Sequence, residues 1–186
     1  MIMTLTQAKR LVARQAGKVS LKSLKKVFLS RRVNPRLAES VLLNNANENV
    51  LIKVRDFLVK RVIIASDKSA LNVLVRASDE GLNKNWESRL HAVKGLETLA
   101  KKGELKVLPG LLKAVNDSDA IVRLCAVDGL RILALKGEAG VLPGLLVAVK
   151  DSDANVMWHA VSGLKSLAEL GNKQAQKKLI LLGKTW

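Results

Sequence analysis

Apolar residues recur along this chain with the spacing of an amphipathic helix. Between residues 120 and 135 the apolar side chains fall at i, i+4, i+8, i+11 and i+12, namely Val122, Ala126, Leu130, Leu133 and Ala134. That spacing places them on one face of a helix with 3.6 residues per turn. No segment of the sequence shows the apolar–polar alternation of a strand. The pattern therefore predicts an all-α fold.

The helical pattern repeats. Residues 107–140 and 141–174 are two copies of one 34-residue sequence, and residues 89–106 match the second half of both copies. Each full copy begins with Leu-Pro-Gly, where proline is tolerated because the first turn of a helix has unbonded N–H groups. An Asp-Ser-Asp-Ala turn follows, in which Asp119 and Asp153 are placed to cap the next helix. Each copy therefore predicts two helices joined by a short capped turn.

These features resemble the HEAT repeat, in particular the short HEAT-like repeats of the bilin-lyase type. Their signature combines Leu-Pro, two leucines, an Asp-x-Asp-x-x-Val-Arg turn and an alanine-rich second helix, and the turn is matched by Asp117, Asp119, Val122 and Arg123. The resemblance implies an α-solenoid of about five helix pairs in a right-handed superhelix, with a binding or scaffolding role. It also implies that Arg123 pairs with the turn aspartates of a neighbouring repeat.

The remaining copies depart from this pattern. Met157 replaces the turn arginine in the last full copy, and Asn85 with Trp86 breaks the turn in the copy at 73–106. Gly95, Gly129 and Gly163 share one repeat position inside the second helices, which predicts a close approach of the two helices of each pair. Trp86 and Trp158 are interpreted first as filler of the core or of the space between repeats, and second as a ligand platform.

Weaker signals extend the prediction to the whole chain. Asn34-Pro35 starts a divergent helix pair over 35–64, shorter helices are expected at 5–16 and 21–29, and Asn172 begins a last helix that runs to about Leu182. We predict one α-solenoid domain over 1–186. Its parts are basic N-terminal helices (1–34), divergent repeats (35–106), the two clear repeats (107–174) and a C-terminal cap (175–186).

Composition agrees with such a domain. The chain has 186 residues, of which 48% are hydrophobic, and only three prolines. It contains no apolar run of the ~18 residues that a transmembrane helix needs. Its single cysteine, Cys125, excludes an internal disulfide and fits a reducing compartment. We expect a cytoplasmic protein, with a targeting peptide as the alternative interpretation of the basic N-terminal segment.

The distribution of charge along the chain indicates more about function than the composition does. The net charge is +16, and residues 1–38 contain ten cations and no acid, namely Lys9, Arg10, Arg14, Lys18, Lys22, Lys25, Lys26, Arg31, Arg32 and Arg36. Like charges four residues apart on a helix destabilise it, so this block indicates a negatively charged partner. Nucleic acid is the partner we predict, bound through backbone phosphates. An acidic protein is the alternative, followed by a solvated face or an anionic membrane.

Sequence-specific base recognition is not expected. The chain has no tyrosine, two phenylalanines and three tryptophans, so it lacks the aromatic platforms on which nucleic-acid bases stack. A second, weaker row of cations follows the second helices and would extend the basic surface along the concave face of a solenoid. This row contains Arg89, Lys94, Lys101, Arg131 and Lys165.

Catalytic chemistry finds little support in the sequence. His91, Cys125 and His159 share one repeat position, but helices pack ~8 to 10 Å apart, too far for three successive helices to ligate one zinc ion. Neither a P-loop nor a dinucleotide-binding glycine motif is present. We predict no catalytic residues, no metal and no cofactor. HEAT-like alkylpurine DNA glycosylases and bilin lyases stay as minor alternatives, although no residue here can be matched to their catalytic sites.

Overall fold

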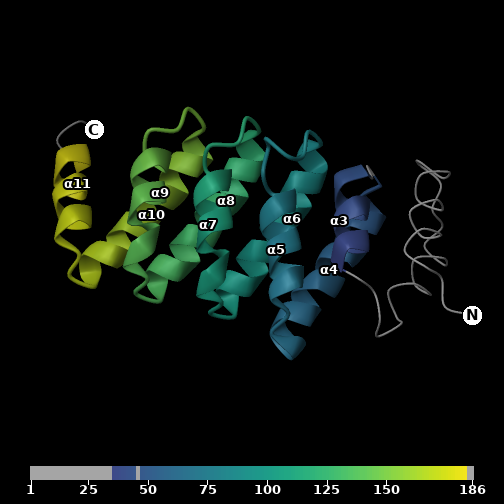
Figure 1. Ribbon diagram of the computed structural model, residues 1–186. Coiled ribbons are helices and arrows are strands. Elements are labelled where there is room, and N and C mark those ends of the chain that lie inside the picture. Colours follow the sequence, from purple (N-terminus) through teal and green to yellow (C-terminus); the bar gives the residue numbers. More distant parts are fainter. Residues whose placement is uncertain (1–34, 45–46, 184–186) are drawn as a thin grey trace, which may run out of the picture. The chain divides into compact units, whose positions relative to one another are not determined.

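The structure is a computed structural model that describes residues 35–44 and 47–183 (Figure 1). Every element within these residues is helical and none is a strand, which confirms the predicted all-α fold. The chain divides into two compact units, Met1–Gly95 and Leu96–Trp186, which are treated separately below. The helices expected at 5–16 and 21–29 lie outside the described residues.

The described part of the first unit contains three complete helices and the beginning of a fourth. They are α3 (Pro35–Asn44), α4 (Glu48–Ala65), α5 (Lys68–Ala77) and α6 (Trp86–Lys101). Helices α3, α4 and α5 pack against one another around buried leucines that include Leu42, Leu51 and Leu74. Asn47 caps α4 and Asp67 caps α5 through side-chain oxygens that accept backbone N–H groups. The helix pair predicted over 35–64 is confirmed.

The second unit holds two similar helix pairs and a last helix. A 3-10 turn (η1, Leu105–Val107) precedes α7 (Leu108–Ala114) and α8 (Ala120–Leu135), and another (η2, Ala139–Val141) precedes α9 (Leu142–Ala148) and α10 (Ala154–Glu169). Helix α8 packs on α7, α9 and α10, while α10 also packs on α11 (Lys173–Gly183) (Figure 1). The predicted last helix is therefore confirmed, and Asn172 caps it.

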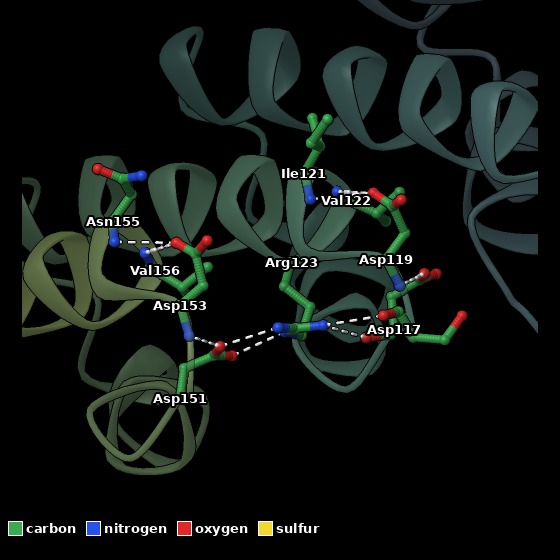
Figure 2. Close-up of polar contacts among 10 residues, drawn as sticks. Asp117, Asp119, Ile121, Val122, Arg123, Asp151, Asp153, Asn155 and Val156 are labelled. Atoms are coloured by element: carbon green, nitrogen blue, oxygen red, sulfur yellow. Dashed lines mark hydrogen bonds and ion pairs between the residues drawn. The ribbon is translucent and has the colours of Figure 1, made fainter.

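The turn inside each pair is built by two aspartates. Asp119 Oδ1 accepts the N–H groups of Ile121 and Val122 at 2.9 and 3.1 Å. Asp153 accepts from the equivalent residues of α10 at the same distances, which confirms the predicted caps (Figure 2). The first aspartate of each turn braces the second, because Asp117 Oδ1 accepts from the N–H of Asp119 at 2.9 Å. Two of the N–H groups that lack an intrahelical partner in the first turn are thus satisfied.

The turn before α6 has the same geometry, so our expectation that Asn85 breaks it is wrong. Asn85 Oδ1 accepts the N–H of Ser88 at 3.1 Å, and Asn83 Oδ1 accepts the N–H of Asn85 at 3.2 Å. These contacts repeat those of Asp119 and Asp117. An asparagine amide oxygen accepts such bonds as an aspartate does, so the turn survives the loss of charge.

Glycines end the second helices and allow the pairs to pack closely. Gly103, Gly137 and Gly171 follow α6, α8 and α10 with φ of 85°, 83° and 88°, the left-handed conformation of a helix C-cap. Within α8, a Cβ atom on Gly129 would lie 3.0 Å from both Cδ atoms of Leu111. Gly163 meets Leu145 at the same distance, which confirms the predicted close approach of the helices.

Candidate nucleic-acid interface

The N-terminal cations predicted to bind nucleic acid lie outside the described residues. Nine of the ten precede residue 35, and Arg36 lies in α3 with a side chain that the structure does not describe. The described residues therefore bear on the second predicted set, the row of cations on the second helices.

Arg89 has a structural role in the first unit. Its residue is only 2% exposed, its guanidinium Nη1 donates to the carbonyl oxygen of Asn83 at 3.0 Å, and its Nη2 lies 3.9 Å from Glu80 Oε1. Arg123 makes the same donation to Asp117 O one repeat later. Arg89 thus holds the turn in place and presents no charge on the surface.

Two cations of the row are paired within the second unit. Lys101 Nζ forms an ion pair with Glu97, four residues earlier on α6, and this hydrogen bond raises the pKa of Lys101. Arg131 Nη2 lies 2.6 Å from Asp128 Oδ1 on α8. Because each carboxylate lies close to its cation, opposite charges alternate on the surface around these two pairs. Their electrostatic potential is therefore small at a distance.

The last two members of the row differ from these. Lys94 is half-buried in the first unit and already has a polar interaction. Lys165 on α10 is exposed and takes part in none of the ion pairs among the described residues. The structure therefore leaves Lys165 as the member whose charge is most available to a partner.

The predicted partner of Arg123 is found. Its Nε and Nη2 donate to the two carboxylate oxygens of Asp151 at 2.7 and 2.9 Å, and its Nη1 donates to the carbonyl oxygens of Asp117 and Ser118 (Figure 2). The ion pair is mostly buried, and its hydrogen bond holds the pKa of Asp151 below the usual value. One guanidinium therefore links the turns of two successive repeats.

A polar groove of about 670 Å³ runs beside this ion pair. Its walls include Asn116, Leu146, Lys150 and Ser152, together with Arg123 and Asp151 themselves. Since Arg123 is already neutralised, exposed Lys150 is the cation that this groove offers to an anion. A single lysine can contact one phosphate but does not form an extended interface.

His91, Cys125 and His159 have different surroundings within their own units. Cys125 Sγ contacts Glu97 Oε2 at 3.2 Å, and His159 Nδ1 lies 3.2 Å from Asp128 Oδ1. His91 is 4% exposed, burial lowers its pKa, and its Nδ1 atom has no hydrogen-bond partner. No three His, Cys, Asp or Glu side chains in the described part of the chain form a metal-binding group.

Sequence reasoning missed the exposure of the tryptophans. Trp86 is 42% and Trp158 is 61% exposed, so the interpretation of these side chains as internal filler is wrong. The signal was available for Trp158, because it replaces Leu124 of the preceding copy at a position next to the altered Met157.

Comparisons with known proteins add no family to these observations. No protein-family model matches the sequence, and a comparison with curated proteins finds no match. Among residues 35–44 and 47–183, no helix combines the length and apolar character needed to cross a bilayer.

Proposed function

We propose that this chain is a non-enzymatic, HEAT-like α-solenoid that binds the phosphate backbone of DNA or RNA with little sequence preference. The solenoid is supported by the recurrence of one helix pair with the same caps, the same C-terminal glycines and the same glycine–leucine packing. A reducing, cytoplasmic location fits the single, buried cysteine, Cys125.

The observation that carries the binding proposal is the charge of residues 1–38. This segment has ten cations and no acid, whereas residues 39–80 contain six of each sign. Cations that have no acid nearby in sequence are available to an external polyanion, and their binding releases the counterions condensed on nucleic acid.

The carboxylates of the described residues support the same conclusion, because many already have partners within their own unit. Those that pair with a cation are Glu39, Asp56, Asp67, Glu80, Glu97, Asp128 and Asp151. Asp67 also caps a helix, as do Asp119 and Asp153. Carboxylates engaged in this way are less available to neutralise the N-terminal block, so an external anion is the better partner for it.

The structure also refines the proposed surface. Arg89 is left out because it is buried, and Lys101 and Arg131 are given minor roles because each is already paired. Lys165 and the exposed cations near helix ends, such as Lys136 and Lys150, are the described residues that can add phosphate contacts. We therefore assign most of the binding free energy to the N-terminal block.

Salt dependence tests the proposal. Affinity for a random duplex DNA and a duplex RNA should fall linearly on a log–log plot against salt, with a slope of about −0.9 for each phosphate contacted on DNA. The triple variant Lys22→Glu, Lys25→Glu, Lys26→Glu should bind more weakly and show a shallower slope. Its circular dichroism should match that of the unmodified chain, because we propose that these charges serve binding and contribute little to folding.

Two outcomes would contradict the proposal. One is the absence of retention on either nucleic acid at about 50 mM salt, where non-specific phosphate contacts are strong. The other is tight binding to polyglutamate together with no binding to DNA or RNA, which would identify an acidic protein as the partner.

A further inference from the structure

An apolar cavity of about 260 Å³ lies between α10 and α11 in the second unit. Its apolar walls are formed by Met157, Trp158 and Val161 of α10 and by Leu179 and Leu182 of α11. Lys165, one helical turn after Val161, is the one charged residue among the described residues that line it. Small-molecule sites typically have this composition, with apolar walls and very few polar groups that orient the ligand.

The repeat shows that this surface differs from its predecessor. Met157 occupies the position of Arg123, which is ion-paired, and Trp158 occupies the position of Leu124. Val161 is half-buried, whereas the equivalent Val127 of α8 is 0% exposed. Terminal units of repeat proteins normally present a polar outer face. Here α10 instead carries Met157 in place of a charged side chain and Trp158 in place of a smaller apolar one, and α11 leaves this surface accessible to solvent.

Charge around the cavity limits what that ligand can be. Helices α10 and α11 contain Lys165, Lys173, Lys177 and Lys178 but a single acid, Glu169. Because Lys165 takes part in no ion pair among the described residues, its ammonium group is free to bind an anion at the rim. A cationic or a neutral ligand would form no ion pair with this ammonium group.

We propose that this cavity binds a small amphipathic anion, an acyl or aryl acid whose apolar body enters the cavity while its acidic group pairs with Lys165. The volume is near the lower end for ligand pockets and above that of a cavity that holds benzene, so roughly ten carbon atoms fit. The lining residues of this site all belong to the second unit, and its ligand is not a nucleic acid.

Two fluorescent probes with the same ring system test the proposal. In both probes the naphthalene ring is the part that matches the size of the cavity. Anilinonaphthalene sulfonate carries the anion, and N-phenylnaphthylamine lacks it. The full chain should bind one equivalent of the sulfonate, and decanoate should displace it. Lys165→Glu should weaken sulfonate binding at least about fivefold and change amine binding less than about twofold. Lys136→Glu makes the same charge change elsewhere in the unit and should affect neither probe.

A cavity-filling variant separates this site from other apolar surface. Val161→Trp should weaken binding of both probes while DNA retention stays unchanged. If Val161→Trp does not fold, Trp158→Ala replaces it in this experiment, because it changes an exposed side chain of the same cavity wall and should also weaken binding of both probes. Sulfonate binding that survives these variants would overturn the proposal, as would an equal loss of both probes in Lys165→Glu. Binding that appears only after removal of residues 184–186 would also overturn it, because the chain itself would then occupy the cavity.

Discussion

Single side chains connect the turns of this protein, and the bond between Arg123 and Asp151 is the clearest example. The guanidinium reaches the carboxylate through two hydrogen bonds of 2.7 and 2.9 Å, and both side chains are mostly buried. Asp151 Oδ1 also accepts the N–H of Asp153. One carboxylate therefore stabilises its own turn and the preceding repeat at the same time.

Asp151→Asn should lower the free energy of unfolding at pH 7 by about 1 to 3 kcal/mol, because it removes a charged hydrogen-bond acceptor. The pKa of Asp151 is depressed by the hydrogen bond from Arg123, so its stabilisation is present above the usual value of 3.8. The stabilisation is lost as pH falls through the lower native pKa. Denaturant unfolding should therefore show a difference between the two proteins that is constant from pH 5 to 7 and shrinks below pH 3.8.

The matched control for this experiment is Ser152→Asn, which changes the exposed neighbour of Asp151. It should alter stability by less than about 0.5 kcal/mol at every pH. If Asp151→Asn were equally harmless at pH 7, the ion pair would not link the repeats in solution.

The buried side chain of His91 should make the stability of the fold depend on pH in the range just below neutrality. Burial lowers its pKa below the usual 6.5, with smaller contributions from Arg55 and Lys94. Between the native and unfolded pKa values the unfolded chain holds a proton that the native chain lacks, so stability should fall as pH drops below 6.5. In His91→Leu this loss should be reduced, by at most about 1.4 kcal/mol for each pH unit.

The comparison variant for His91 is His159→Leu, at the same repeat position but with a more exposed side chain. Denaturant midpoints measured between pH 5 and 8 should keep the His91-dependent loss in this variant. The same pH profile for His91→Leu and the unmodified chain would show that the imidazole is not buried in solution.

Gly137 tests the backbone at a helix end. Its φ of 83° is a conformation that costs an L-residue about 1 to 2 kcal/mol. Gly137→Ala should lower the thermal midpoint accordingly, even though no atom lies closer than 3.9 Å to the added methyl group. Lys136→Ala, at the preceding residue with negative φ, should leave the midpoint almost unchanged, and an equal effect of both would contradict the cap.

At the scale of helices, the distance within a pair is set by glycine. A side chain at Gly129 would meet both Cδ atoms of Leu111, which is fully buried and has little space to move. Gly129→Val should therefore destabilise the chain by about 1 to 3 kcal/mol, although valine normally forms helix better than glycine.

Ser162→Val controls for the β-branched side chain in that experiment, since Ser162 lies in α10 and is exposed. Its effect on the denaturant midpoint should stay within about 0.5 kcal/mol. A Gly129 variant as stable as this control would mean that α7 and α8 are not held at the observed distance.

Much of the helical arrangement could be predicted because capping and periodicity are local. Asp119, Asp153 and Asn172 cap the helices that their positions predicted. The prediction that Asn85 breaks the turn was wrong because the helix needs an oxygen acceptor at this position, and an asparagine amide provides one. Helix α5 begins at Lys68, earlier than the repeat frame suggests, since Asp67 provides a cap there.

The cation row was less predictable, because pairing and burial depend on neighbours in space. Two of the ion pairs could nevertheless be predicted from the sequence separation of opposite charges on one helix. They are Glu97 with Lys101 at i, i+4 and Asp128 with Arg131 at i, i+3. A structural role for Arg89 was indicated by the repeat position that it shares with Arg123, but its burial could not be predicted, since it depends on the fold of residues 80–83 around the guanidinium. The cavity beside Trp158 likewise requires α11, whose residues lie outside the repeat.

At the scale of the whole molecule, charge is distributed unevenly along the chain. The net charge is +16, yet the segment 1–38 contributes ten cations without an acid, and the remaining cations are interspersed with acids. If binding depends on unpaired charge rather than on net charge, cations from the two regions should differ in their effect on nucleic-acid affinity.

Two double variants with the same change in net charge test that difference. Lys22→Gln with Lys25→Gln should reduce the magnitude of the log–log salt slope for duplex DNA by about 2, close to 0.9 for each lost phosphate contact. Lys101→Gln with Arg131→Gln should change it by less than about 0.5, because both side chains are already paired with Glu97 and Asp128. Equal changes in the two slopes would mean that DNA senses only the total charge, and the N-terminal block would lose its special role in the proposed interface.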